Sequence, residues 1–156
     1  IHTFQGAVRR FDFHIRTDRI VFIDDYAHHP RELSAAIESI KALYTDKKIT
    51  AVFQPHLYSR TRDFAQEFAD SLSLLDDVIL LDIYPAREEP IEGVSSQIIF
   101  DKITSAQKLL CTKQELTDLL RNKDVEVLVT FGAGDIDRLL PEIEQVLKEK
   151  YLSGSK

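Results

Sequence analysis

Two polar clusters, each directly after a short apolar run, contain residue types suited to binding a charged ligand. The apolar run at 20–23 leads into a cluster at 24–30, and the run at 49–53 leads into a cluster at 54–62. Together the clusters hold two aspartates, three histidines, two tyrosines and two arginines. Guanidinium groups bind carboxylate or phosphate through paired hydrogen bonds, and imidazoles can donate to anionic or polar groups. These side chains therefore indicate a ligand site, and no nucleophile stands out among them.

Asp24 and Asp25 end the first apolar run, where neighbouring side chains on a strand point to opposite faces. One carboxylate could therefore face a crevice and contact a ribose hydroxyl or a metal-bound water. The other interpretation is that one of the two caps a helix that begins at Pro30. The residues alone leave both interpretations open.

The histidines of the clusters also admit more than one interpretation. Each could donate a hydrogen bond to a ligand or pack as a structural residue beneath a strand end. His28, His29 and His56 together could form a zinc site. Zinc is the weaker hypothesis, because no cysteine accompanies them and no two histidines stand four residues apart on a helix.

Arg60 and Arg62 fall at the predicted start of a helix. Arginine is unfavourable there for the helix dipole, so its presence indicates an anionic ligand. The alternative is a solvated arginine that pairs with Asp63 or Glu67.

Small residues follow the last apolar run, at Gly132-Ala133-Gly134, and would let the backbone approach a ligand closely. They do not form a dinucleotide fingerprint, because the third glycine of that motif would fall at Asp137. The sequence contains neither G-x-x-x-x-G-K-[ST] nor G-x-S-x-G. The Glu88-Glu89 pair is interpreted as a solvated turn. The chain therefore carries no recognisable machinery of its own for phosphoryl or acyl transfer.

Apolar patterns predict the elements that position these clusters. Strands at 11–15 and 20–24 form a hairpin, and further strands lie at 49–53, 77–83, 108–111 and 125–131. Helices are predicted at 30–43, from near Arg60 to 75 with Ser59 or Thr61 as its cap, at 95–103, after 112 and at 136–151. Thr112 and Glu115 match a capping box for the helix after 112.

Strands that alternate with helices predict an α/β fold. We expect a mostly parallel sheet of about six strands, with right-handed crossovers, helices on both faces and one antiparallel strand at an edge. The carboxyl ends of parallel strands meet at one edge, where open α/β sheets bind ligands, so both clusters should share that edge. A single domain is expected over residues 1–156, with a disordered tail at 153–156.

Composition narrows the class of protein. The 156 residues carry a net charge of −6, which argues against broad binding of nucleic acid or of anionic membranes. No run approaches the roughly 20 apolar residues of a membrane span, and no signal peptide is recognised at the start. The single cysteine, Cys111, fits a reducing compartment and is expected to be an inert, packed thiol. The chain begins with Ile1, as a fragment of a longer protein would.

Five ordered motifs, which cover essentially the whole chain, resemble the C-terminal domain of the Mur ligases of peptidoglycan synthesis. They are Phe4-x-Gly6-x-x-Arg9-Arg10-Phe11, Asp24-Asp25-Tyr26-Ala27-His28-His29-Pro30, Phe53-Gln54-Pro55-His56-x-Tyr58-Ser59-Arg60-Thr61-Arg62, Asp82-x-Tyr84-Pro85-Ala86-x-Glu88-x-Pro90, and Gly132-Ala133-Gly134-Asp135-Ile136. The second and third motifs favour the family member that adds L-alanine over a relative that attaches a ready-made tripeptide.

The resemblance implies a Rossmann-like third domain that closes over an N-terminal UDP-sugar domain and a central ATPase domain that carries the P-loop. In this family ATP phosphorylates the carboxylate of UDP-N-acetylmuramate, and the amine of the amino acid then displaces phosphate. Mg²⁺ would be held mainly by the central domain. The resemblance further implies a cytoplasmic bacterial ligase of cell-wall biogenesis, cell shape and cell division, and an isolated third domain that is inactive without the P-loop.

The family's functional residues carry over onto the matching positions. Arg10 would reach the ATP phosphates, with Arg9 as the weaker candidate, and Asp25 would approach the ribose. The resemblance gives the pocket for L-alanine and the acyl phosphate as Tyr26, His28, His56, Arg60 and Arg62. Within this pocket Arg60 would bind the alanine carboxylate, and His28 and His56 would position the acyl phosphate. Gly132, Ala133 and Gly134 would bring backbone close to the substrates, and no residue is assigned to a metal.

Two departures from the family pattern bear on the site. Leu57 replaces a frequent arginine, so part of the anion binding is weaker or is supplied by Arg62. Ala27 replaces a frequent glycine, a mild change if that position has no positive φ. Two alternatives from other classes remain, a stand-alone Rossmann-like nucleotide-binding module and a zinc-dependent hydrolase that uses His28, His29 and His56.

Overall fold

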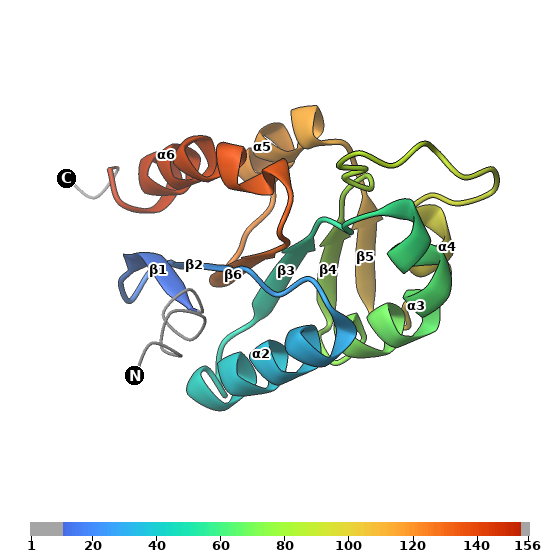
Figure 1. Cartoon of the computed structure of the whole chain (residues 1–156). Helices are drawn as coiled ribbons and strands as arrows, with labels where there is room; N and C mark the ends of the chain where they lie inside the picture. Colours follow the sequence, from blue (N-terminus) through green and yellow to red (C-terminus); the bar gives the residue numbers. More distant parts are fainter. Residues whose placement is uncertain (1–10, 154–156) are drawn as a thin grey trace, which may run out of the picture.

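The computed structural model describes residues 11–153, which form a six-stranded sheet between two layers of helices (Figure 1). In chain order the elements are β1 (Asp12–Arg16), β2 (Val21–Asp25), α2 (Pro30–Leu43), β3 (Ile49–Phe53), α3 (Tyr58–Leu72), β4 (Asp77–Leu80), α4 (Gln97–Phe100), β5 (Gln107–Leu110), α5 (Lys113–Asn122), β6 (Val127–Phe131), the 3₁₀ helix η1 (Asp135–Leu139) and α6 (Leu140–Tyr151). The motif that contains Arg9 and Arg10 lies outside the described residues. Of the tail predicted at 153–156, only Ser153 is among the described residues. Its hydroxyl donates to the carbonyl of Glu149.

The strands lie in the order β1-β2-β6-β3-β4-β5. Every neighbouring pair is parallel except β1 and β2, which form the predicted hairpin with an irregularity between Phe13 and Ile15. The α/β fold with one antiparallel edge strand is therefore confirmed.

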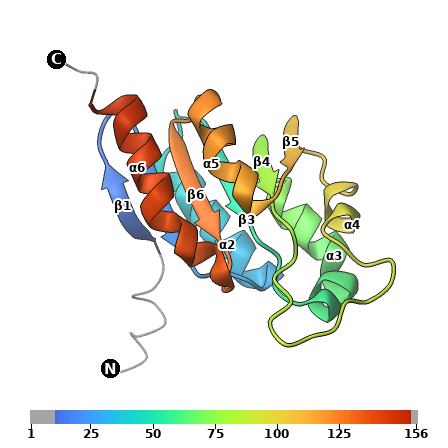
Figure 2. The same cartoon turned by 90° about the horizontal axis from the view of Figure 1, so that it is seen from above.

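Helices cover both faces of the sheet, as predicted. Strands β3, β4 and β6 are buried along their whole length, which is why their sequences are apolar without alternation. Val21, Ile23 and Ala51 pack in the core layer beneath α2, α3 and α4. Phe22 and Val52 belong to the second layer, beneath α5 and α6, which lie over the sheet in Figure 2.

The parallel register brings the strand ends to one level. Asp25 at the end of β2 pairs with Phe131 at the end of β6, and Phe131 pairs with Phe53 at the end of β3. Helix α2 begins at Pro30, as predicted, and the segments after β2, β3 and β6 leave the sheet at the same edge.

Several predicted elements were too long. The strand expected over 125–131 covers only Val127–Phe131, and the helix expected to reach residue 75 ends at Leu72. The helix expected over 136–151 is divided into η1 and α6, because Pro141 has no N–H to donate to the carbonyl of Asp137. Strand β4 ends at Leu80 rather than at residue 83, and the helix expected over 95–103 covers only Gln97–Phe100. Over residues 11–153, none of the helices is long and apolar enough to cross a bilayer.

Candidate functional site

Backbone hydrogen bonds continue beyond the strands and hold the loops of the carboxyl edge together. The N–H of Gly132 donates to the carbonyl of Asp25 over 3.3 Å, and the N–H of Gln54 donates to that of Phe131 over 3.1 Å. Pairing between the segments after β3 and β4 extends as far as a parallel bridge between His56 and Tyr84. The two predicted clusters therefore do share one edge.

Four rings from three of these loops are in contact along this edge. The ring centroids of Tyr26 and His28 are 5.4 Å apart, and those of His28 and His56 are 5.8 Å apart, both in edge-on geometry. Tyr84 stacks on the other side of His56, with centroids 5.6 Å apart and planes 12° apart. The structure thus brings Tyr26, His28 and His56 together, as expected, and adds Tyr84, which the sequence analysis did not select as a site residue.

His56 occupies a partly desolvated position. Burial lowers the pKa of His56 below its ordinary value, the positive charges of His28 and Arg60 lower it further, and Glu88 opposes them. Its Nδ1 is buried and makes no hydrogen bond within the described part of the chain. A neutral imidazole is therefore the dominant form at neutral pH, and it can take part in positioning without adding charge.

The two arginines of α3 differ in their surroundings. Arg62 is exposed, and its Nε donates to Asp63 over 2.9 Å. Arg60 is half-buried and forms no ion pair with any of residues 11–153. Of the two guanidinium groups, only that of Arg62 is therefore engaged by a carboxylate of the described residues.

The cap predicted for this helix was wrong. The helix begins at Tyr58, so neither Ser59 nor Thr61 precedes it, and its N-cap is Leu57 with φ 75°. Thr61 Oγ1 donates to the Leu57 carbonyl over 2.9 Å instead. Ala27, the other departure from the family pattern, has no positive φ, so its methyl group causes no backbone strain.

The solvated-turn interpretation of Glu88 was also wrong. Glu88 Oε1 accepts from the N–H of Ser59 over 3.1 Å, and Oε2 accepts from the Ser59 hydroxyl. These bonds, led by the hydroxyl bond, hold the pKa of Glu88 below its ordinary value. The carboxylate therefore belongs to the edge that carries Arg60 and His56.

The glycine loop after β6 packs closely against the rings. Gly132 has φ 146°, a conformation that other residues rarely adopt. A Cβ on Gly134 would lie 2.5 Å from the Tyr84 ring and 2.7 Å from Gln54 Oε1. The buried Gln54 anchors this loop, since its Nε2 donates to Asp135 and its Oε1 accepts from the N–H of Ile136. Close backbone approach is thus built into this side of the edge.

Neither aspartate caps α2, contrary to one of the two interpretations. The N-cap is His29, and the side chain of Glu32 accepts from its N–H. Asp25 is fully buried, and its Oδ1 accepts from the N–H of Ala27 over 2.8 Å. Asp24 accepts from the Thr130 hydroxyl over 2.7 Å, and burial raises its pKa. The role of Asp25 at a ribose stays a prediction.

The described residues do not assemble a metal site. Within residues 11–153, no three metal-ligating side chains gather around a common point. His29 packs against Phe64, with centroids 5.4 Å apart, while His28 and His56 contact each other. Nothing in this geometry favours the zinc hydrolase.

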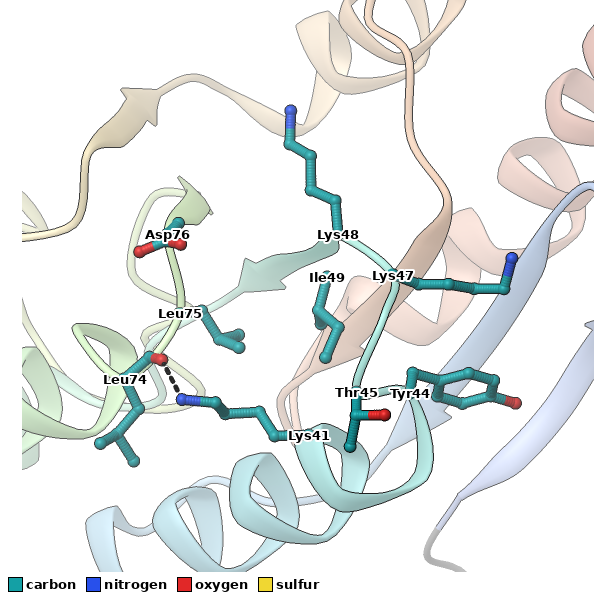
Figure 3. Close-up of a pocket in the computed structure, with 9 residues that line it drawn as sticks. All are labelled: Lys41, Tyr44, Thr45, Lys47, Lys48, Ile49, Leu74, Leu75 and Asp76. Carbon is teal, nitrogen blue, oxygen red and sulfur yellow. Dashed lines mark hydrogen bonds between the residues drawn. The ribbon is translucent and has the colours of Figure 1, made fainter.

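Pockets also occur away from the ring cluster. One of about 590 Å³ runs between α2 and α3, from His29 and Phe64 to Leu74. Another of about 270 Å³ lies at the opposite edge of the sheet, where Lys41 donates to the carbonyl of Leu74 (Figure 3). Three lysines line that pocket, and the side chains of Lys47 and Lys48 point in different directions (Figure 3).

Comparison with known proteins assigns the chain to a family. Residues 9–134 match the model of the Mur ligase, glutamate ligase domain. The chain belongs to the Mur ligase family. The matched residues of this Mur ligase domain include both polar clusters, the loop with Tyr84 and Glu88, and the glycine loop up to Gly134.

Relatives of this Mur ligase domain are similar over nearly all of its length. It is 59% identical over 149 residues to a UDP-N-acetylmuramate–L-alanine ligase of Phocaeicola vulgatus, and 61% identical over 145 residues to that of Parabacteroides distasonis. These matches cover 95% and 93% of this chain but 32% and 31% of the relatives. The chain thus spans about a third of the length of the curated relatives.

A solved structure supports the same relationship. The crystal structure of the UDP-N-acetylmuramate–alanine ligase of Thermotoga maritima superimposes on this Mur ligase domain with a TM-score of 0.69 and 26% sequence identity. The match covers 90% of this chain and 30% of the other.

Proposed function

We propose that this chain is the amino-acid-binding C-terminal domain of an ATP-dependent ligase that joins L-alanine to UDP-N-acetylmuramate. The observation that carries the proposal is at one sheet edge: His28 and His56 are in ring contact, and Arg60, which has no ion pair among the described residues, is near enough for its charge to lower the pKa of His56. The identity of about 60% to relatives named as L-alanine ligases supports the choice of amino acid.

In the proposed reaction the muramate carboxylate attacks the γ-phosphorus of ATP, and ADP leaves. The amine of L-alanine then attacks the acyl carbon, loses a proton, and inorganic phosphate leaves as the amide bond forms. Such a reaction needs donors around a developing oxyanion and accurate placement of the amine, and it needs no nucleophilic side chain. The cationic, imidazole-rich edge meets this requirement.

The residues would divide these tasks. Arg60 binds the alanine carboxylate, because its guanidinium is half-buried and not engaged by Asp63 as that of Arg62 is. The remaining substrate contacts come from Tyr26, His28, His56 and the backbone of 132–134, with Arg62 adding positive charge at the rim. Arg10 and Asp25 would approach ATP.

The parts of the reaction that this chain does not supply would come from the rest of a three-domain ligase. We propose an N-terminal domain for the UDP-sugar and a central P-loop domain for ATP and Mg²⁺, in agreement with the third of the relatives' length that the chain spans. This chain alone is then inactive. The ligase would act in the bacterial cytoplasm, in peptidoglycan synthesis and hence in cell-wall biogenesis.

The test is phosphate release by the full-length ligase with ATP, Mg²⁺ and UDP-N-acetylmuramate, with L-alanine, glycine, L-serine or the cell-wall tripeptide as acceptor. Release that depends on L-alanine and requires a much higher L-alanine concentration in Arg60→Ala, but not in the exposed Arg121→Ala control on α5, supports the proposal. Release with the tripeptide alone would assign the tripeptide-adding relative. Nucleotide binding without release for any acceptor would favour a binding module.

A further inference from the structure

Helix α3 begins without the features that normally stabilise a helix start. Its N-cap, Leu57, offers no side-chain acceptor, and the first turn contains no acidic residue. Arg60 stands in that turn instead, and Arg62 directly follows it, although the positive end of the helix dipole disfavours cations. This turn needs an acceptor and a negative charge from elsewhere in the fold.

Glu88 supplies both from the loop after β4, 29 residues further along the chain. Its two carboxylate oxygens accept from the N–H and from the hydroxyl of Ser59, the residue directly before Arg60. The adjacent Glu89 is exposed and makes no such contact. The contact with Ser59 is therefore specific to one of two neighbouring acids.

The backbone on both sides of this contact adopts a rare conformation. Leu57 has φ 75° and Ala86 has φ 56°, a left-handed region that residues other than glycine seldom occupy. The N–H of Glu88 donates to the carbonyl of Pro85 and closes a turn. The N–H of Leu57 donates to the carbonyl of Tyr84 over 2.8 Å. Such strain persists where the surroundings fix the conformation, so both segments are held in place against each other.

We propose that Glu88 is a positioning residue: its carboxylate fixes the first turn of α3 and thereby directs Arg60 toward the carboxylate of the amino acid. This inference rests on the proposed function. Arg60 would bind the carboxylate of L-alanine, and this carboxylate does not react. A displaced Arg60 would therefore weaken the binding of L-alanine equally in the ground state and in the transition state. That kind of loss raises KM and leaves kcat nearly unchanged.

The experiment uses the full-length ligase, with Glu88→Ala, Glu88→Gln and the matched control Glu89→Gln. For Glu88→Ala we expect KM for L-alanine to rise on the order of tenfold, the size of one charge-assisted hydrogen bond, with kcat and KM for ATP within about twofold. Glu88→Gln keeps an acceptor for the Ser59 N–H and should fall between wild type and Glu88→Ala. Glu89→Gln should match wild type.

A double variant tests whether Glu88 acts through Arg60. If it does, Glu88→Ala combined with Arg60→Ala raises KM no further than Arg60→Ala alone, because the two effects are coupled. Additive effects, a fall in kcat with unchanged KM, or Glu88 variants that match Glu89→Gln would overturn the inference and leave the proposed function intact. Wild-type enzyme without L-alanine-dependent phosphate release would overturn both.

Discussion

The imidazole of His56 lies nearly parallel to the phenol ring of Tyr84, with 12° between the planes and 5.6 Å between the centroids. A backbone bridge joins the same two residues, and Gly134 packs closely against the Tyr84 ring. Tyr84 thus connects the loop after β4 with the loops after β3 and β6.

Truncation of Tyr84 should loosen this connection. We expect Tyr84→Ala to lower the free energy of unfolding by about 2 kcal/mol, from lost apolar burial and the lost ring pair. Tyr84→Phe keeps the ring and should stay within about 0.5 kcal/mol of wild type. Urea unfolding measures both, and equal losses in the two variants would show that the ring contact is not the stabilising element.

Substitution of Gly134 tests the close packing of the glycine loop. Gly134→Ala places a methyl group 2.5 Å from the Tyr84 ring, so we expect a loss of about 1–3 kcal/mol in the free energy of unfolding. Tyr84→Ala should relieve most of that loss when the two changes are combined, because the obstructing ring is gone. If urea unfolding shows that the losses of the two single variants simply add in the double variant, the added methyl group does not clash with the Tyr84 ring.

The lowered pKa of His56 predicts a specific pH dependence. The folded chain binds a proton at His56 less readily than the unfolded chain, so acidification below about 6.5 favours unfolding. His56→Gln should remove this part of the slope of stability against pH. By NMR we expect the His56 ring to titrate below 6.5 and the midpoint to rise in Arg60→Ala. A midpoint above 6.5 would contradict the desolvated position.

Cys111 should be chemically inert, as its apolar surroundings in the sequence indicated. Burial, followed by the charges of Glu115 and Asp82, raises the pKa of this thiol from 9.0 to about 11. At pH 8 its thiolate fraction is then roughly a hundredfold smaller than that of an unperturbed thiol. Alkylation by iodoacetamide should be slower by about the same factor in native protein than in urea, whereas comparable rates would mean that the thiol is accessible.

Sequence patterns predicted the helices whose starts are stabilised by residues close by in the sequence. The helix at 30–43 follows from Pro30 and its apolar stripe, and the capping box of Thr112 and Glu115 holds as expected. The start of α3 was missed because its stabilising partner, Glu88, is far along the chain, while Ser59 and Thr61 mimicked a local cap.

The candidate site divides in the same way. His28 and His56 could be placed together because both follow parallel strands, whose carboxyl ends share an edge. Tyr84 and Gln54 acquire their roles from the strand order and from the path of the glycine loop, which no spacing in the sequence specifies. The difference between Arg60 and Arg62 likewise depends on side-chain surroundings.

The most direct test of the proposed function is the identity of the product. Full-length ligase would be incubated with ATP, Mg²⁺, UDP-N-acetylmuramate and L-alanine, and the UDP-linked product analysed by mass spectrometry over time. We predict that UDP-N-acetylmuramate gains a single alanyl residue and that Arg60→Ala lowers kcat/KM for L-alanine on the order of a hundredfold. A wild-type product without the alanyl residue, or an Arg60→Ala enzyme as efficient as wild type, would contradict the account.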